Sequence, residues 1–568
     1  LPETALTGYF LEGGVRELAL TAGAQAADLQ RVFRSAVPGN RTLEMVLGFY
    51  EVWNNTLYNS AMWVRVGGDA PLIRHVHRKN FLPTYGLFDE ERFVERGQSF
   101  RAFDTPWGRC AVLICEDAWH SLTGTLLALD GARAMFICSA APARGPWPRD
   151  DGIPGPTSVA RWERLVRDIA EEHGVFVSFS NLASTEAGKS FPGGALVAGP
   201  KGDVRMRGPL WREAILPVPF DLNELTRARA DMPLLADLRI AMPHLIDTLG
   251  HIQAGHASGP VFDTDGAASP ATPTGASAAP ARQGAIEVVC GGPDVAGGPP
   301  PLDIDPVLTT EWLTAFLRDE VADRGFAKGI VALSGGVDSA VTAFLAARAL
   351  GKENVVGVRL PYRSSSPESL AHAQLVIDAL GIEGRTIDIS AAVDGYLANE
   401  PDAGATRRGN VMARTRMIAL FDLSARHQAI PLGTGNKTER LLGYFTWHAD
   451  DSPPVNPLGD LYKTQVWALA RHLGVPREII EKAPTADLVS GQTDESDLGI
   501  SYPKADLILQ WLLHGYSVPE LVARGFDARQ VELVHHRLES THWKRRLPTV
   551  AIMSSTAIGE SYLRPVDW

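Results

Sequence analysis

Cysteine is scarce in this chain of 568 residues, which contains only Cys110, Cys115, Cys138 and Cys290. None of them forms a C-x-x-C pair, so neither a disulfide framework nor a dithiol redox motif is expected. The cysteines and histidines also lack the spacing of zinc ligands. Each cysteine is therefore either a small buried side chain or a reactive thiol.

Long apolar runs and an excess of basic charge are missing as well. No uninterrupted apolar run reaches the roughly 18 residues that a membrane-spanning helix needs. The chain does not open with a basic segment followed by an apolar one, as a signal peptide would. The net charge of −12 gives no electrostatic footprint for nucleic acid. We expect a soluble, cytoplasmic protein that binds neither nucleic acid nor membranes.

The composition, 45% hydrophobic and 21% charged, supplies material for large cores. At about 100–200 residues per domain, the length suggests two to four domains. In the first half, short apolar runs predict buried strands at residues 109–115, 134–138 and 175–179. Apolar residues at helical spacing predict a helix over residues 158–172.

A change of composition divides the chain. Residues 251–301 are rich in Ala, Gly, Pro, Ser and Thr, which predicts a flexible linker with one short strand at 285–289. Beyond it, strands predicted at 329–333 and 355–360 flank a helix predicted at 340–350. Strands that alternate with helices indicate parallel sheets. We therefore expect two α/β domains, residues 1–250 and residues 302–568, joined by that linker.

The sharpest local signal is the heptad Ser334-Gly335-Gly336-Val337-Asp338-Ser339-Ala340. It follows a predicted strand and opens a predicted helix, where paired glycines and a helix N-terminus favour the binding of an anion. Asp338 can hold a divalent cation on a bound phosphate. The Walker pattern is absent. The alternative is a Gly-rich strand-to-helix turn with a Ser/Asp cap.

This heptad resembles the pyrophosphate-binding loop of the ATP-pyrophosphatase superfamily, and later segments narrow the resemblance to NAD synthetases. The matching segments, in chain order, are residues 361–366, 408–417, 433–439, 456–466, 484–488 and 491–495. The resemblance implies a doubly wound, Rossmann-like parallel sheet. It also implies that the nicotinate carboxylate of deamido-NAD attacks the α-phosphate of ATP, and that ammonia then displaces AMP.

The resemblance also implies binding residues by their position in the motifs. Asp338 and Glu439 are the implied Mg²⁺ ligands, and Arg414 and Lys544 the implied contacts of deamido-NAD. The implied ATP contacts are Ser334, Gly335, Gly336, Asp338, Ser339, Thr434, Lys463 and Thr485. Taken singly, each has a plainer alternative: Arg414 could face solvent, and Lys463 could be a solvated lysine. The chain departs from many relatives at residues 447–450, so no contacts of that segment are implied.

Cys115 ends an apolar run, a position from which a side chain can project into a cleft. A nucleophilic role requires a neighbouring base or cation, and simple packing is the alternative. Residues 1–9, 79–90, 113–119 and 191–195 resemble the carbon–nitrogen hydrolase, or nitrilase, superfamily.

The second resemblance implies an α-β-β-α sandwich with a Glu–Lys–Cys triad. Cys115 would attack the glutamine amide, Glu3 would act as general base, and Lys79 would stabilise the oxyanion. Tyr9, Tyr85 and Glu116 would line the glutamine pocket. Family members place a strand and a helix before the glutamate, so we expect either a true start upstream or a missing outer strand.

A nitrilase-like part followed by an NAD synthetase-like part is the organisation of glutamine-dependent NAD synthetases, which are C–N bond-forming ligases. It implies deamido-NAD, glutamine and ATP as substrates, a protected path for ammonia and a homo-oligomer. One alternative is an ammonia-dependent synthetase whose first domain is inactive or structural. Another is an amidase whose second domain senses nucleotides without catalysis.

Overall fold

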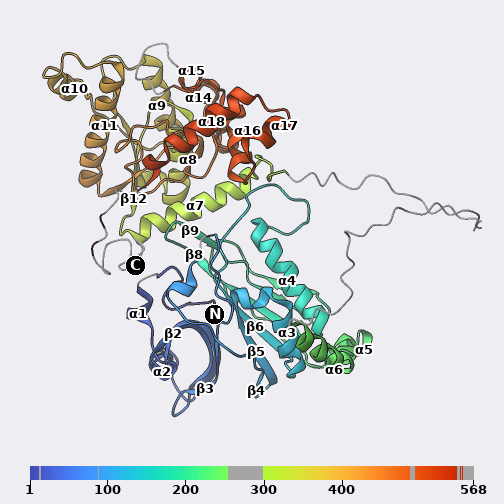
Figure 1. Cartoon of the computed structure of the whole chain (residues 1–568). Helices are drawn as coiled ribbons and strands as arrows, with labels where there is room; N and C mark the ends of the chain where they lie inside the picture. The colour runs from blue at the N-terminus through green and yellow to red at the C-terminus, as the bar shows by residue number, and fades with distance from the viewer. Residues whose placement is uncertain are drawn as a thin grey trace, which may run out of the picture.

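The structure is a computed structural model, which describes residues 1–11, 14–86, 88–253, 298–485, 493–546, 551 and 553. The strand predicted at 285–289 and most of the predicted linker lie outside the described residues. Figure 1 shows two bodies, one built from each half of the chain.

The first body contains an antiparallel sheet of three long strands in the order β1-β2-β3. The strands are β1 (Thr42–Trp53), β2 (Thr56–Gly67) and β3 (Leu72–Arg78). Asn54 and Asn55, both with positive φ, form the two-residue turn between β1 and β2. Asparagine tolerates this left-handed backbone, which matches the twist of a tight hairpin. β3 ends directly before Lys79.

A second, six-stranded sheet has the order β11-β10-β7-β6-β5-β4. Its parallel centre is β5 (Gly108–Ile114), β6 (Ala134–Ser139) and β7 (Phe176–Asn181). The flanking strands are β4 (Phe103–Thr105), β10 (Leu196–Ala198) and β11 (Val204–Arg207). The three apolar runs of the first half are thus confirmed as strands, and they are predominantly apolar because both faces of the sheet are covered.

The two sheets pack face to face between helices, which confirms the predicted α-β-β-α sandwich (Figure 1). On the outer face of the first sheet, α2 (Ala22–Ala36) buries Ala26 against Leu47 and Met62. On the outer face of the second sheet lie α3 (Ser121–Leu129) and α4 (Thr157–His173). Then follow α5 (Asn223–Asp231) and α6 (Leu234–Gln253).

The second body contains a four-stranded parallel sheet in the order β14-β13-β12-β15. The strands are β12 (Lys328–Ala332), β13 (Val355–Arg359), β14 (Glu383–Thr386) and β15 (Ala429–Leu432). One face packs against α7 (Pro306–Asp323), α8 (Val337–Leu350) and α13 (Lys463–Leu473). The other face packs against α10 (Ser390–Leu397) and α11 (Ala405–His427). Helices on both faces confirm the doubly wound prediction.

The sheet order places a ligand crevice. β13 and β15 lie on opposite sides of β12, so the connections that leave β12 and β15 run to opposite sides of the sheet's switch point between these two strands. In open parallel sheets, ligands bind outside the carboxyl ends of the strands at such a point. The remaining helices of this body are α9 (Pro367–Leu380), α12 (Lys437–Leu441), α14 (Arg477–Glu481), α15 (Asp494–Leu498), α16 (Tyr502–Leu513), α17 (Val518–Ala523) and α18 (Ala528–Ser540).

The two bodies meet along α7. The ring of Trp211 in the first body stacks on Trp312 of α7 at a centroid distance of 5.6 Å. The backbone N–H of Asp305 donates to the carbonyl of Pro146. The hairpin of β8 (Ala183–Glu186) and β9 (Lys189–Pro192) also lies against α7 (Figure 1). Within the described ranges, none of the helices has the length and apolar character needed to cross a membrane.

Candidate active sites

Cys115 lies at the carboxyl end of β5, in a tight turn. Its φ of +42° belongs to the left-handed region, which a non-glycine residue adopts only when its surroundings hold it there. The carboxylate of Asp117 supplies that restraint: Oδ2 accepts the backbone N–H of Ile114 at 3.3 Å. Oδ1 accepts the N–H groups of Asn80 and Phe81, each at 3.0 Å. The turn of Cys115 is thereby tied to the segment that follows Lys79.

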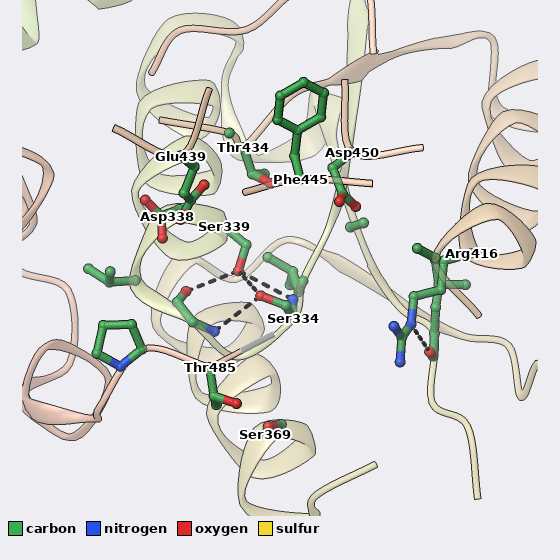
Figure 2. Close-up of a pocket in the computed structure, with 18 of the residues that line it drawn as sticks. Ser334, Asp338, Ser339, Ser369, Arg416, Thr434, Glu439, Phe445, Asp450 and Thr485 are labelled. Carbon is green, nitrogen blue, oxygen red and sulfur yellow. Dashed lines mark hydrogen bonds between the residues drawn. The ribbon is translucent and has the colours of Figure 1, made fainter. Parts of the chain in front are cut away.

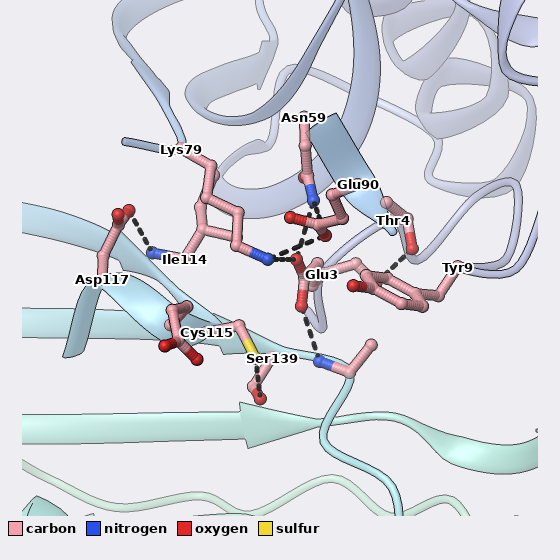
Figure 3. A network of polar contacts seen from close by, with 12 residues as sticks. Glu3, Thr4, Tyr9, Asn59, Lys79, Glu90, Ile114, Cys115, Asp117 and Ser139 are labelled. Carbon is pink, nitrogen blue, oxygen red and sulfur yellow. Dashed lines mark hydrogen bonds and ion pairs between the residues drawn. The ribbon is translucent and has the colours of Figure 1, made fainter. Parts of the chain in front are cut away.

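Lys79 lies between two carboxylates in the interior (Figure 3). Its Nζ donates to Oε1 of Glu3 and to Oε1 of Glu90, each at 2.8 Å. Asn59 donates to the same two oxygens at 2.7 and 3.2 Å. Burial lowers the pKa of Lys79, but the charges of Glu3 and Glu90 outweigh it and hold the pKa well above its usual value. Lys79 is therefore a fixed cation.

Glu3 is held from several sides and is fully buried. Its second oxygen, Oε2, accepts the backbone N–H of Ala140 at 2.9 Å (Figure 3). The preceding backbone lies against β1, where Gly48 donates to the carbonyl of Pro2 at 3.1 Å. A Cβ on Gly48 would lie only 2.4 Å from the backbone nitrogen of Thr4, so this close approach requires glycine.

The thiol of Cys115 lies in the same buried network. Its Sγ is 3.4 Å from Oγ of Ser139, which donates to it. Burial, and next the negative charge of Glu3, raise the pKa of the Cys115 thiol, against the smaller opposing effect of Lys79. At neutral pH the thiol is protonated, so nucleophilic attack requires transfer of its proton to a nearby base.

Glu90 is a site residue that sequence reasoning missed. It lies in a segment that carried the resemblance, but an Asp-Glu-Glu run gives no sign of which carboxylate points inward. Burial is the main reason that its pKa is raised, and Glu3 adds to the shift. Two carboxylates on one lysine therefore compete for a single positive charge, which favours a proton on one of them.

The three residues predicted to line the glutamine pocket are placed differently from one another. Tyr85 is 60% exposed, and its hydroxyl donates to Oε2 of Glu116 at 2.8 Å. Glu116 follows Cys115 directly and is partly exposed, so the two side chains form a polar pair at the surface beside the Cys115 turn. Tyr9 is buried, with its ring 5.7 Å from Nζ of Lys79 (Figure 3). Tyr9 therefore packs against the triad from inside.

The second site is the loop between β12 and α8 (Figure 2). Oγ of Ser339 accepts the backbone N–H of Ser334 at 3.3 Å and donates to the carbonyl of Gly336 at 3.0 Å. Gly335 has a φ of +78°, and a Cβ there would lie 2.2 Å from the carbonyl oxygen of Ser369. The loop therefore closes on itself and presents its backbone at the carboxyl end of β12.

A cavity of about 280 Å³ opens in front of this loop. Its lining includes most of the residues predicted for ATP and metal binding. These are Ser334, Gly336, Asp338, Ser339, Thr434, Glu439, Lys463 and Thr485. They come from the segments after β12 and β15, from α8, α12 and α13, and from the segment after α14, so the cavity lies at the crevice that the strand order indicates.

Lys463 pairs with two of the acidic residues that line the cavity. Its Nζ is 2.5 Å from Oδ2 of Asp338 and 3.3 Å from Oε1 of Glu439. Asn436 donates to the other oxygen of Asp338 at 3.0 Å. Burial raises the pKa of Glu439 to about 8, a shift that Lys463 opposes and Asp338 increases. A cation placed here relieves the repulsion between the carboxylates.

Asp338 and Glu439 could together hold a magnesium ion. Mg²⁺ in nucleotide sites commonly takes one or two carboxylates and completes its shell with phosphate and water oxygens. Across the described part of the chain, no cluster of three or more His, Cys, Asp or Glu side chains forms a metal site of its own. Two carboxylates beside a phosphate loop therefore fit an ion that arrives with a nucleotide.

Two predicted residues do not reach this cavity. Arg414 is exposed and donates to the carbonyl of Trp447 at 2.9 Å. Lys544 donates to the carbonyls of Gly443 and Phe445 at 2.9 and 3.0 Å. Both bind the backbone of the segment that forms one wall, so they support that wall from behind.

Arg416 is the cationic side chain of α11 that lines the cavity. Its Nε donates to the carbonyl of Leu360 at 3.1 Å (Figure 2). It stands two residues after Arg414 in the same motif. Only the rotation of the helix, which a sequence does not give, decides which of the two arginines faces inward.

An α-β-β-α body with a Cys–Glu–Lys cluster is thus followed by a Rossmann-like body with a phosphate loop. Residues 1–230 match the carbon–nitrogen hydrolase family, and residues 309–548 match the NAD synthase family. The NH(3)-dependent NAD(+) synthetase of Chlorobaculum parvum is 46% identical over 271 residues, which are 48% of this chain and 98% of that protein. The NH(3)-dependent NAD(+) synthetase of Trichlorobacter lovleyi is 46% identical over 268 residues, which are 47% of this chain and 98% of that protein.

The whole chain also resembles solved structures in fold. A glutamine-dependent NAD+ synthetase from Acinetobacter baumannii, solved with ADP, aligns with a TM-score of 0.66 and 22% identity, over 100% of this chain and 91% of that one. One from Cytophaga hutchinsonii aligns with a TM-score of 0.63 and 16% identity, over 96% and 87%. The chain belongs to the NAD synthase family and carries a carbon–nitrogen hydrolase domain at its N-terminal side.

Proposed function

We propose that the protein amidates deamido-NAD to NAD at the expense of ATP, with ammonia released from glutamine in the first domain. The observation that carries the proposal is the presence of two complete constellations in one chain. Cys115, Glu3 and Lys79 meet in one buried cluster, and a phosphate loop faces Lys463, Asp338 and Glu439 in a single cavity.

In the first domain, Glu3 accepts the thiol proton as Sγ of Cys115 attacks the amide carbon of glutamine. Lys79, cationic and held at 2.8 Å from Glu3, stabilises the negative charge on the amide oxygen. Glu3 then passes the proton to the leaving nitrogen, ammonia departs, and water hydrolyses the thioester. Tyr85 and Glu116, joined by their hydrogen bond, hold the glutamine beside the thiol.

In the second domain, the Ser334–Ser339 loop binds the ATP phosphates through its backbone and hydroxyl groups. Lys463 and Arg416 offset the charge that develops as the nicotinate carboxylate attacks the α-phosphate and pyrophosphate leaves. Asp338 and Glu439 would hold Mg²⁺, which supplies further charge neutralisation when it is bound. Ammonia then attacks the adenylated carboxylate, and AMP leaves.

Free ammonia would be protonated in bulk water, so we further propose a protected path between the two sites, in a cytoplasmic homo-oligomer. Arg414 and Lys544 take part by fixing the wall at residues 443–447 against which deamido-NAD lies. The second candidate, an ammonia-dependent synthetase with a structural first domain, is supported by the identity with the relatives from Chlorobaculum and Trichlorobacter.

The experiment supplies deamido-NAD and Mg-ATP with either glutamine or ammonium, and measures NAD. Cys115→Ala is compared with Cys138→Ala, which removes another buried thiol of the same domain. We expect NAD from both donors, with Cys115→Ala losing only the glutamine reaction and Cys138→Ala keeping both. NAD from ammonium alone would favour the second candidate. NAD from neither donor by the folded protein would refute the proposal.

A further inference from the structure

The β8–β9 hairpin contacts the segment that carries the general base. Oε2 of Glu186, at the end of β8, accepts the backbone N–H groups of Tyr9 and Phe10 at 2.8 and 3.2 Å. Gly8 lies directly against the same carboxylate. The segment that begins at Glu3 is thus fixed by two acceptor contacts about six residues after the base.

The other side of the hairpin contacts the NAD synthase domain. At its tip, the N–H of Gly188 donates to Oε1 of Glu320 at 2.9 Å. Within β8, Oγ1 of Thr185 donates to Oδ2 of Asp319 at 3.1 Å. Thr185 and Glu320 are both buried, whereas Gly188 is exposed and Asp319 is partly exposed, so each bond has one partner shielded from solvent. Figure 1 shows the hairpin directly beside α7, the helix that carries both acidic residues.

The hairpin crosses a gap between the domains. A cavity of about 890 Å³ is lined on one side by Thr7, Gly8 and Phe10, and on the other by Asp319 and Asp323 of α7. The segment after Glu3 and α7 thus face each other across open space, with the hairpin at its border. Helix α7 can therefore restrain the segment after Glu3 through the hairpin.

Helix α7 is in turn packed on the helix that opens the ATP site. Leu317 and Val321 of α7 share a buried core with Val341 and Leu345 of α8. The first turn of α8 carries Asp338. A continuous series of hydrogen bonds and core contacts therefore runs from the Glu3 segment, through the hairpin and α7, to the phosphate loop.

We infer that Glu186, Asp319 and Glu320 are positioning residues for glutamine hydrolysis. Helix α7 of the synthetase domain holds the hairpin, and the hairpin holds the backbone that presents Glu3 to Cys115. The synthetase reaction with ammonium does not need this restraint, because its residues lie on the far side of α7. This inference rests on the proposed hydrolysis of glutamine by Cys115.

The test uses the full chain with Glu320→Ala and Glu186→Ala, each compared with its glutamine counterpart, Glu320→Gln or Glu186→Gln. Glutamine keeps a side-chain oxygen that can accept the backbone N–H, whereas alanine removes it. Glutamate release from glutamine, and NAD formed from ammonium, are measured for each protein. Misplacement of a catalytic group by about 1 Å costs on the order of a hundredfold in rate.

We expect both alanine variants to lose about tenfold or more in kcat for glutamate release, with little change in KM for glutamine. The glutamine variants should recover most of this rate, and NAD formation from ammonium should stay within about twofold in all four. Equal losses with both donors would mean a general structural role and would overturn the inference. Unchanged glutamate release would overturn it as well.

The unmodified chain separates this inference from the proposed function. If it releases no glutamate from glutamine, the proposed first-domain reaction fails, and the positioning role fails with it. If it releases glutamate and the alanine variants match it, only the positioning role fails.

Discussion

Asp117→Asn tests whether a single buried carboxylate sets the geometry of the Cys115 site. Oδ2 of Asp117 accepts from Nε2 of His77 at 2.8 Å in addition to the N–H of Ile114. With Oδ1 on Asn80 and Phe81, the carboxylate joins the segments directly after β3 and β5, which carry Lys79 and Cys115. Asparagine has the same shape but replaces one acceptor oxygen with an NH₂ group.

The size of the effect follows from these contacts. The NH₂ group faces the N–H of Ile114, and one buried donor left unpaired costs about 1–3 kcal/mol. The bonds to Asn80 and Phe81 also lose charge assistance, which roughly halves their strength. A cost of about 3 kcal/mol at the positions of Lys79 and Cys115 corresponds to about a hundredfold in rate.

The assay is NAD formation from glutamine and, separately, from ammonium. For Asp117→Asn we expect the glutamine reaction to fall about a hundredfold and the ammonium reaction to stay unchanged. Asp130→Asn is the matched control, because Asp130 accepts the N–H of Ala102 and pairs with Arg109 at the opposite end of β5. A glutamine rate for Asp117→Asn equal to that of Asp130→Asn would refute the reasoning.

Three further predictions concern different parts of the molecule. Gly48→Ala places a Cβ 2.6 Å from Cα of Glu3, so glutamate release should fall at least tenfold. The control is Gly23→Ala in helix α2, where a Cβ has open space around it, and this variant should release glutamate at the unchanged rate. Glu439→Gln removes one of the two carboxylates that pair with Lys463, so NAD formation from both donors should fall about a hundredfold, and half-maximal activity should need more Mg²⁺. Glutamate release that falls equally would contradict this. Burial lowers the pKa of His75 to about 4, so its unfolded form takes up a proton first as pH falls below about 6.5, and stability is lost between these values. In denaturant titrations, the loss of unfolding free energy between pH 6.5 and pH 4 should therefore be smaller in His75→Phe, by up to about 3 kcal/mol. An unchanged pH dependence would exclude His75 as its source.

Much of the fold could be predicted because it depends on local pattern. The runs at residues 109–115, 134–138 and 175–179 are buried strands, as is the run before the phosphate loop. Each is predominantly apolar, as expected of a strand that is covered on both faces. The helix predicted at 158–172 is α4, which extends one residue further at each end.

The candidate sites were predictable where a motif fixes the backbone, and unpredictable where only packing decides. The Ser334–Ser339 loop follows from its glycines and its place between strand and helix. In α11, by contrast, Arg416 faces the cavity and Arg414 binds a carbonyl behind the wall. Two residues apart on a helix, side chains point about 200° from each other, and neighbouring elements decide which one faces inward.

The sequence by itself determined the two α/β domains, their order, and the chemical groups available to each site. Only the tertiary structure decided which groups meet. Glu3 and Lys79 are separated by 76 positions yet lie 2.8 Å apart, and Glu90 joins them although no local pattern marks it. The physical reason is that local structure, such as a strand end or a loop, determines only the backbone position of a residue. Its partner is fixed by sheet order and by the cost of burying an unpaired charge, which are properties of the whole fold.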